Sequence, residues 1–244
     1  MMELGGTKAL VTGGGSGIGL GVALALAGEG CRVAIAGRSR EKLEKAAAEC
    51  ASQPPMLYRA CDVADRSDVG ELVAWALENL GSLDIVVNSA GINVARRKMS
   101  ELDPDDFDRI MAINCTGLYN VLHAVLPVMR RQQSGLIFNI SSVAGKRALT
   151  IAGPAYCASK FAATALGAAV GLEERPNGIR ITNIYPGEVD TPILDQRPVP
   201  VPAEKRAAMV HPADIAHCVV ALAKLPPNVI VPELVIAPTY QVDV

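Results

Sequence analysis

Residues 12–19 read Thr12-Gly13-Gly14-Gly15-Ser16-Gly17-Ile18-Gly19, between the apolar run 9–11 and the apolar stretch 20–27. A buried strand, a glycine-rich turn and a helix N-terminus form an anion site. Glycine lets the backbone approach a pyrophosphate, and free N–H groups and the helix dipole favour its charge. The spacing T-G-x-x-x-G-x-G differs from the usual dinucleotide pattern G-x-G-x-x-G. A flexible turn without a ligand is the alternative, but the position after the first strand favours a nucleotide.

Short apolar runs alternate with helix-like stretches along the rest of the chain. We expect strands at residues 9–11, 33–36, 56–58, 85–87, 136–140, 179–184 and 234–236. Most of these runs are continuously apolar, which is typical of strands buried on both faces of a parallel sheet. Composition and apolar spacing predict helices at 20–27, 40–51, 67–79, 104 to about 131, 154–174 and 212–224.

The alternation of strands and helices predicts an α/β fold. We expect a single-domain, Rossmann-type, doubly wound parallel sheet of about seven strands over residues 1–244, with helices on both faces. Asp103 is the expected N-cap of the long helix and Pro104 its first residue. Pro127 is expected to kink that helix.

Composition limits the partners that we expect. The 244 residues carry a net charge of −2 and only 4% are aromatic, so neither a basic field nor a stacking surface points to nucleic acid. No run of about 18 uncharged apolar residues suggests a membrane span. Residues 1–6 lack signal-peptide features, which predicts a cytoplasmic protein. The six cysteines and three histidines are scattered, which favours reduced, mostly buried thiols and no metal site.

The end of the second strand indicates which dinucleotide binds. In dinucleotide folds an acidic residue there binds the ribose hydroxyls of NAD, whereas an arginine accepts the 2′-phosphate of NADP. Here the strand ends Ala36-Gly37-Arg38-Ser39, without a carboxylate. A guanidinium is a good phosphate partner, and the hydroxyls of Ser16 and Ser39 can add contacts. The sequence therefore predicts NADP(H), with NAD(H) possible if Arg38 is an ordinary solvated side chain.

Tyr156 and Lys160 are spaced to share one face of a helix. A nearby ammonium favours phenolate and lowers the tyrosine pKa, so the pair can act as a general acid and base. Ser142 follows the fifth strand, at the strand end where open α/β sheets bind ligands. Its hydroxyl can hydrogen-bond a substrate carbonyl.

Together these motifs resemble the short-chain dehydrogenase/reductase family in its form of about 250 residues, over nearly the whole chain. The matching motifs are Thr12-Gly13-x-x-x-Gly17-x-Gly19, Asp62-Val63, Asn88-Ser89-Ala90-Gly91, Asn114, Ser142, Tyr156-x-x-x-Lys160, and Pro186-Gly187 with Thr191.

The resemblance implies a role for each motif residue. Tyr156 would protonate the carbonyl oxygen, Lys160 would lower the tyrosine pKa and hold the nicotinamide ribose, and Ser142 would orient the substrate. Asn114 would support a water that links Lys160 to solvent. The implied cofactor contacts are Gly13, Ser16, Gly17, Ile18 and Gly19 at the phosphates, Arg38 and Ser39, Asp62 and Val63 at the adenine, Asn88, Ala90 and Gly91 at the ribose, Tyr156 and Lys160, and Pro186, Gly187, Val189 and Thr191 at the carboxamide.

Alternatives remain for individual residues. Ser141 and Ser142 point to opposite faces of a strand, so only one can face the substrate. Asn114 can simply bridge backbone groups, and Asp62 can be a plain turn residue. Residues 96–98, Arg96-Arg97-Lys98, are interpreted as a solvated loop, with attraction of an acidic substrate as the alternative. Glu188 can face either the site or solvent.

The chain departs from the family pattern in three places. Ser89 stands where relatives usually repeat asparagine, the interval between Ser142 and Tyr156 is one residue longer, and residues 229–240 lack a glycine-rich ending. The last departure puts in doubt the transfer of tetramer contacts and of the substrate pocket. Residues 192–206 are expected to cover the substrate as a short loop.

The sequence predicts an enzyme: an NADP(H)-dependent oxidoreductase that transfers a hydride between nicotinamide and a carbonyl or secondary alcohol of a small substrate. The alternatives are a non-catalytic nucleotide-binding regulator, or the same fold with another chemistry such as epimerisation. Family members usually assemble on their long helices, and residues 118–128 are apolar enough for an interface, so a homodimer or homotetramer is expected.

Overall fold

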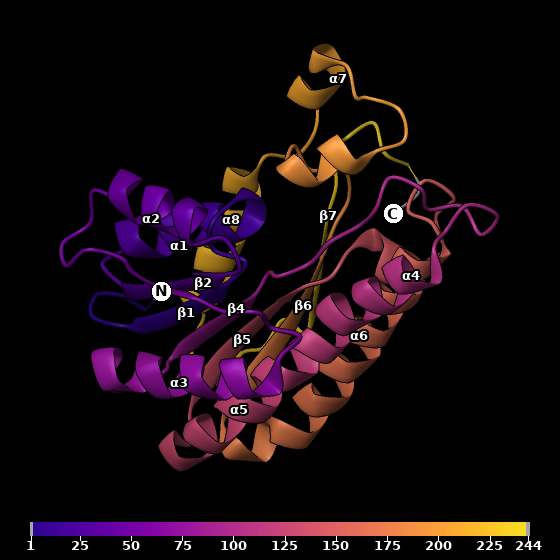
Figure 1. Ribbon diagram of the computed structural model, residues 1–244. Helices are drawn as coiled ribbons and strands as arrows, with labels where there is room; N and C mark the ends of the chain where they lie inside the picture. Colours follow the sequence, from indigo (N-terminus) through magenta and orange to yellow (C-terminus); the bar gives the residue numbers. More distant parts are fainter. Residues whose placement is uncertain (1, 243–244) are drawn as a thin grey trace.

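A parallel sheet of seven strands runs through the centre of the protein in this computed structural model, which describes residues 2–242 (Figure 1). The strand order is β3-β2-β1-β4-β5-β6-β7. The strands are β1 (Lys8–Thr12), β2 (Arg32–Gly37), β3 (Leu57–Ala60), β4 (Ile85–Asn88), β5 (Gly135–Ile140), β6 (Ile179–Pro186) and β7 (Glu233–Ile236). The order reverses between β1 and β4, which is where doubly wound sheets open a crevice for ligands. The predicted fold class is confirmed.

Helices cover both faces of the sheet, as the alternating pattern predicts. One face carries α1 (Gly17–Gly28), α2 (Arg40–Glu49) and α8 (Pro212–Ala223). The other carries α3 (Arg66–Leu80), α5 (Gly117–Gln132) and α6 (Pro154–Glu174). The expected helix at 40–51 ends earlier than predicted, because Cys50 has already turned to an extended conformation.

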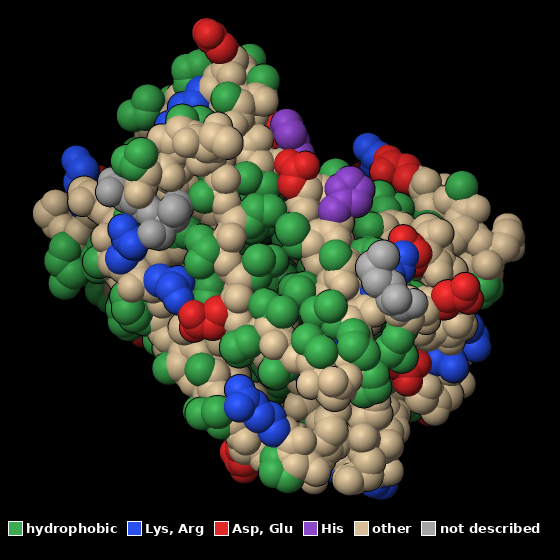
Figure 2. All heavy atoms as spheres, turned by 180° about the vertical axis from the view of Figure 1, so that it is seen from behind, with side chains coloured by type: hydrophobic (Ala, Val, Ile, Leu, Met, Phe, Trp, Pro, Cys, Tyr) green, Lys and Arg blue, Asp and Glu red, His purple; other side chains and the backbone are tan. Residues whose placement is uncertain are grey.

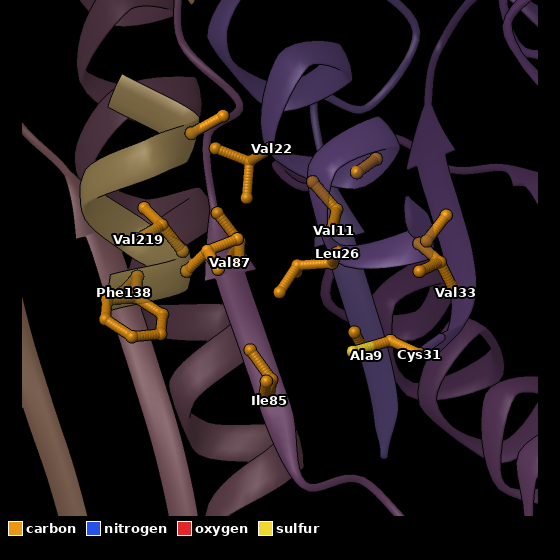
Figure 3. Close-up of a cluster of buried hydrophobic side chains, with 14 of the residues drawn as sticks. Ala9, Val11, Val22, Leu26, Cys31, Val33, Ile85, Val87, Phe138 and Val219 are labelled. Atoms are coloured by element: carbon orange, nitrogen blue, oxygen red, sulfur yellow. The ribbon is translucent and has the colours of Figure 1, made fainter. Parts of the chain in front are cut away.

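Each strand divides its side chains between two cores, because successive residues point to opposite faces. Val11 of β1 belongs to one core with Leu26 of α1 and Val219 of α8; in Figure 3 Leu26 lies beside Val11, and Val219 lies beside Val87 and Phe138. Leu10, the residue before Val11, belongs to the core beneath α3 and α5. The continuously apolar strands are thus buried from both sides.

The long helix expected from residue 104 is not uniform. It begins as α4 (Pro104–Met111), with the Asp103 side chain accepting a hydrogen bond from the Asp105 N–H as predicted. A π-helical segment, Ala112–Thr116, then precedes α5. Pro127 lies inside α5, so the change in helical geometry occurs well before the proline. Asn114 lies in the π segment, and such segments often occur at functional sites.

The segment expected as a loop after β6 contains two short helices. Pro192–Gln196 forms a 3₁₀ helix, and α7 (Ala203–Ala207) projects from the body of the molecule (Figure 1). The chain then returns through α8 to β7 at the edge of the sheet. Residues 192–197 and the C-terminal tail both reach the same end of the sheet.

Candidate active site

A cleft of about 790 Å³ opens at the carboxyl ends of the strands. Its walls come from the turns after β1 and β4, the ends of β5 and β6, helix α6 and the C-terminal tail. Many of the residues predicted from the sequence line it: Gly13, Ser16, Gly17, Ile18, Arg38, Ala90, Gly91, Ser142, Tyr156, Lys160, Pro186, Gly187, Val189 and Thr191. Ser39, Asp62, Val63, Asn88, Gly19 and Asn114 lie outside the lining.

The glycine-rich turn is shaped by close backbone contacts. Gly13 has φ +68°, and a Cβ there would lie 2.7 Å from the carbonyl carbon of Ser89. Gly19 lies behind the cleft wall, where a Cβ would be 2.3 Å from the carbonyl oxygen of Gly13. Helix α1 has no side-chain cap at Ser16 and no acidic residue in its first turn. The turn and the helix end therefore form a cradle that fits a pyrophosphate.

The end of the cleft beside β2 and α2 carries two cations. Arg38 is exposed at the end of β2 and lines the cleft. Lys42 of α2 lines it as well, although the sequence analysis did not select it. Its position in the first turn of the helix that follows Arg38 was the available signal. Ser39 instead caps α2, with its hydroxyl accepting a hydrogen bond from the Lys42 N–H at 3.3 Å.

Three predicted cofactor residues have local structural partners. Asp62 accepts a hydrogen bond from the Ala64 N–H, and its own N–H donates to Asp68, as in a plain turn. Val63 is buried beside Gly117. Asn88 donates to Asn139 at 2.9 Å between β4 and β5. Contact of these residues with an adenine or ribose stays a prediction.

Tyr156 and Ser142 meet in the cleft. Burial raises the pKa of Tyr156 to about 12, while a hydrogen bond with the Ser142 hydroxyl and the charge of Arg97 act to lower it. Ser141 instead turns to α6, where its hydroxyl lies 3.0 Å from that of Thr164. The geometry thus favours Ser142 over Ser141 as the serine next to Tyr156.

Lys160 lies one helical turn beyond Tyr156, its Nζ 5.6 Å from the centre of the tyrosine ring. The ammonium donates to the Ile140 carbonyl at 2.9 Å, and burial lowers its pKa to about 8. The resemblance implied that Lys160 lowers the tyrosine pKa. Here burial dominates and the tyrosine pKa is raised, with Ser142 and Arg97 as the opposing influences.

A small second cavity, of about 20 Å³, adjoins Lys160. Asn114 lines it and uses its amide to bridge other groups: Oδ1 accepts from the Ile92 N–H, and Nδ2 donates to the Ile92 carbonyl and to Ser159. Asn88 and Val63 also line this cavity, and the buried Asn88 Oδ1 has no protein hydrogen-bond partner. A polar cavity of this size can hold one water.

The sequence comparisons place this arrangement among known enzymes. A family model described as short chain dehydrogenase matches residues 7–199. The chain belongs to the short-chain dehydrogenase/reductase family. An uncharacterized oxidoreductase from Staphylococcus aureus is 35% identical over 230 residues, which is 94% of this chain and 96% of the relative.

Solved structures of the family agree in fold and in cofactor type. An alcohol dehydrogenase from Thermococcus sibiricus, complexed with 5-hydroxy-NADP, is 32% identical with a TM-score of 0.87, covering 96% of this chain and 97% of that one. A 3-ketoacyl-(acyl-carrier-protein) reductase from Brucella melitensis, complexed with NADH, is 28% identical with a TM-score of 0.86, covering 96% and 98%. The chain is therefore an oxidoreductase of a family whose members bind nicotinamide dinucleotides.

Arg97 lines the cleft of this short-chain dehydrogenase/reductase, although the sequence suggested that residues 96–98 form a solvated loop. Arg96 and Lys98 are exposed, as expected of a solvated loop, but Arg97 is only 7% exposed. The expectation is wrong for Arg97 because its guanidinium is held by backbone carbonyls of three segments. Local sequence carries no sign of these distant acceptors.

Glu188 joins the substrate end of the cleft to the C-terminal tail. Its carboxylate binds Arg197 at 2.8 Å and Lys205 at 3.3 Å, and accepts a hydrogen bond from the Tyr240 hydroxyl at 2.7 Å. Gln241 accepts from the Glu188 N–H. Glu188 therefore faces protein groups at the cleft wall, and the tail forms part of that wall.

Proposed function

We propose that the protein is an NADP(H)-dependent oxidoreductase that transfers a hydride between nicotinamide and a carbonyl or secondary alcohol of a small substrate. Tyr156 is its general acid and base. The observation that carries the proposal is that Tyr156, Ser142 and Lys160 line the same cleft as the glycine-rich cradle. When bound, the nicotinamide supplies or accepts the hydride.

The proton chemistry follows from the state of Tyr156. A phenol with a pKa of about 12 remains protonated at neutral pH and can donate to a carbonyl oxygen. Ser142 orients that oxygen by a hydrogen bond from its hydroxyl. The protonated state of Tyr156 therefore favours reduction over oxidation.

Lys160 and Asn114 support proton transfer by Tyr156. Lys160 holds the nicotinamide ribose, and its position a helical turn from Tyr156 supports this role. A water in the small cavity beside Asn114 and Lys160 relays protons toward solvent. Asn114 fixes the cavity wall through its three hydrogen bonds.

The preference for NADP(H) rests on Arg38, now joined by Lys42. Two cations beside the cradle suit a 2′-phosphate, and among residues 2–242 no carboxylate lines the cleft at this end. Asp62 and Val63 take the adenine side. Pro186, Gly187, Val189 and Thr191 take the carboxamide side of the nicotinamide. Residues 192–206 cover the substrate, and within this segment the cleft is lined by Pro192, Ile193, Leu194, Gln196 and Arg197.

The test is a substrate panel with a tyrosine variant. Purified protein is mixed with NADPH and ketones, aldehydes and sugars, and absorbance of NADPH is followed. Tyr156→Phe should lower turnover by about 10²- to 10⁴-fold while leaving NADPH binding intact, because the ring stays and the proton is lost.

Tyr119→Phe is the matched control, since Tyr119 is partly exposed on α5 and does not line the cleft. It should keep full activity. Unchanged turnover in Tyr156→Phe would refute the mechanism. Binding of NADPH without turnover of any compound would favour a nucleotide-binding regulator instead.

A further inference from the structure

Arg97 is a buried cation in the same cleft as Tyr156. Its Nε donates to the Val94 carbonyl at 2.7 Å and one Nη to the Ile151 carbonyl at 3.2 Å. The other Nη donates to the Gln196 carbonyl. The guanidinium is thus fixed between the loop after β4, the loop before α6 and the segment after β6.

The charge of Arg97 has no protein counterion among residues 2–242. Its three acceptors are neutral carbonyls, and the charged or ionisable groups that act on it are Arg197 and Tyr156. Burial lowers the pKa of Arg97, with repulsion from Arg197 adding to the effect. An arginine nevertheless remains protonated in proteins, so the cleft holds a buried positive charge.

The neighbouring charged residues do not neutralise the positive charge of Arg97. Glu188, the carboxylate on this side of the cleft, binds both Arg197 and Lys205. Arg109 also lines the cleft, but it pairs with Asp106. The chain as a whole has a net charge of −2, so the positive charge is a local feature of the substrate end.

We propose that the substrate carries an oxyanion, a carboxylate or a phosphate, and that Arg97 binds it while Tyr156 acts on the neighbouring carbonyl or hydroxyl. This inference rests on the proposed function. A guanidinium has five N–H donors in a planar fork that matches such oxyanions, and the carbonyls take only part of that set. A buried charge is costly until a counterion joins it, so the anionic group stabilises the bound state.

Arg97 has a second possible use, which is to favour the phenolate of Tyr156 by its charge. The two uses differ in what they predict. Support for the phenolate would affect every substrate alike and would shift the pH profile. Recognition of an oxyanion would affect anionic substrates alone, and mainly through KM.

The experiment compares matched pairs of substrates: 2-keto acids with their methyl esters, and dihydroxyacetone phosphate with dihydroxyacetone. In at least one pair the anionic member should have a kcat/KM at least tenfold higher, and the pair that responds distinguishes carboxylate from phosphate. Arg97→Met should remove that preference while changing the neutral member a few-fold at most. Arg131→Met, on the exposed side of α5, is the matched control and should keep the preference.

Arg97→Lys tests the charge apart from the hydrogen bonds that join the three segments, because lysine keeps the charge but cannot reach all three carbonyls. It should retain part of the preference. Equal kcat/KM within every pair, or a preference that survives Arg97→Met, would overturn the inference and leave the proposed oxidoreductase function standing.

A binding experiment tests the inference even if no compound is turned over. Malonate and inorganic phosphate are titrated by calorimetry into the protein saturated with NADP⁺. Saturable binding of one of them that is lost in Arg97→Met and kept in Arg131→Met supports the anion site even if no compound is reduced, in which case the proposed function alone fails. No saturable binding of either anion, with no preference in the substrate pairs, overturns the inference.

Discussion

We expect the protonation of Tyr156 to set the direction in which the proposed reaction runs best. Its pKa of about 12 means that the acid form needed for reduction is fully present at neutral pH, whereas the phenolate needed for alcohol oxidation is scarce. Between pH 6 and 7, a unit or more below the pKa of about 8 that burial gives Lys160, the charge of the lysine is nearly constant.

We therefore expect kcat/KM for reduction to be nearly flat over this range, and that for oxidation to rise about tenfold per pH unit. Ser142→Ala should lower kcat/KM for oxidation below the wild-type value, since the interaction with Ser142 helps to lower the pKa of Tyr156. Rate profiles in both directions provide the measurement. An oxidation rate independent of pH would contradict the assignment of Tyr156 as the base.

We expect the choice between NADPH and NADH to depend on Arg38. Arg38→Ala should raise KM for NADPH by about 10- to 100-fold, in keeping with the loss of one or two charged hydrogen bonds, and should leave KM for NADH within a few-fold. Lys42→Ala should act in the same direction, because Lys42 lines the same end of the cleft.

Lys45→Ala is the control for these two variants, since Lys45 is exposed on α2 and outside the cleft. It should change neither constant. An equal rise in KM for both coenzymes would show that Arg38 does not discriminate between them.

Individual residues differ in how far the sequence could predict them. Tyr156 and Lys160 share a helix face because of their spacing, which is local information. Arg97 takes its place through carbonyls of residues 94, 151 and 196, which only the folded chain brings together. Glu188 likewise has its partners on α7 and the tail, and the sequence left its orientation open.

At the scale of elements, the turn between β1 and α1 allows a sharp prediction about stability and dinucleotide binding. Gly19→Ala would place a Cβ 2.3 Å from the Gly13 carbonyl oxygen, and backbone has to move to relieve it. We expect a loss of about 1–3 kcal/mol in the free energy of unfolding, together with weaker dinucleotide binding, because the displaced turn is the cradle itself.

Gly70→Ala is the matched control, because Gly70 lies in α3 and a Cβ there meets nothing within 4 Å. Alanine at an open helical position should stabilise by about 0.5–1 kcal/mol. Denaturant unfolding and NADPH titration of both variants give the comparison. A Gly19→Ala protein as stable as the wild type would mean that the cradle is not closely packed.

The elements that the sequence predicted are those whose pattern is local. Continuous apolar runs identify the buried strands, and the Asp103-Pro104 pair marks the start of α4. The π segment at 112–116 left no such pattern, and within it Asn114 bonds to Ile92 and Ser159, which are distant in the sequence. Helix α7 is a single turn without a buried residue, which gives no periodicity to detect.

At the scale of the whole molecule, the strand order explains why the site lies where it does. Strands β1, β4, β5 and β6 are neighbours in the sheet, so the turns that follow them converge although they are far apart in the sequence. The glycine-rich turn, Ser142 and Pro186 thus line a single cleft. Residue spacing alone does not give this convergence, but the doubly wound topology does.

The outer face of the long helices leaves apolar surface uncovered. Phe161 and Leu172 of α6 are 43% and 64% exposed, and Phe107 of α4 and Tyr119 of α5 are 40% exposed. The helical runs 104–132 and 154–177 are long and apolar enough to cross a membrane by length and composition, with 56% and 33% of their apolar windows buried in the chain. Figure 2 shows a second gathering of apolar side chains, on the face below the projecting α7.

We expect the α4, α5 and α6 face to be covered by a second copy of this chain, because apolar side chains of this size clustered on neighbouring helices mark interaction sites. Sedimentation should give the mass of a dimer or tetramer. Leu172→Glu together with Phe161→Glu should reduce this mass, since burying unpaired carboxylates at the interface is strongly unfavourable. Met99→Glu, at an 80% exposed loop position, is the control and should leave the mass unchanged. A wild-type mass equal to one chain would refute the assembly and would leave α6 as an apolar surface in need of another occupant.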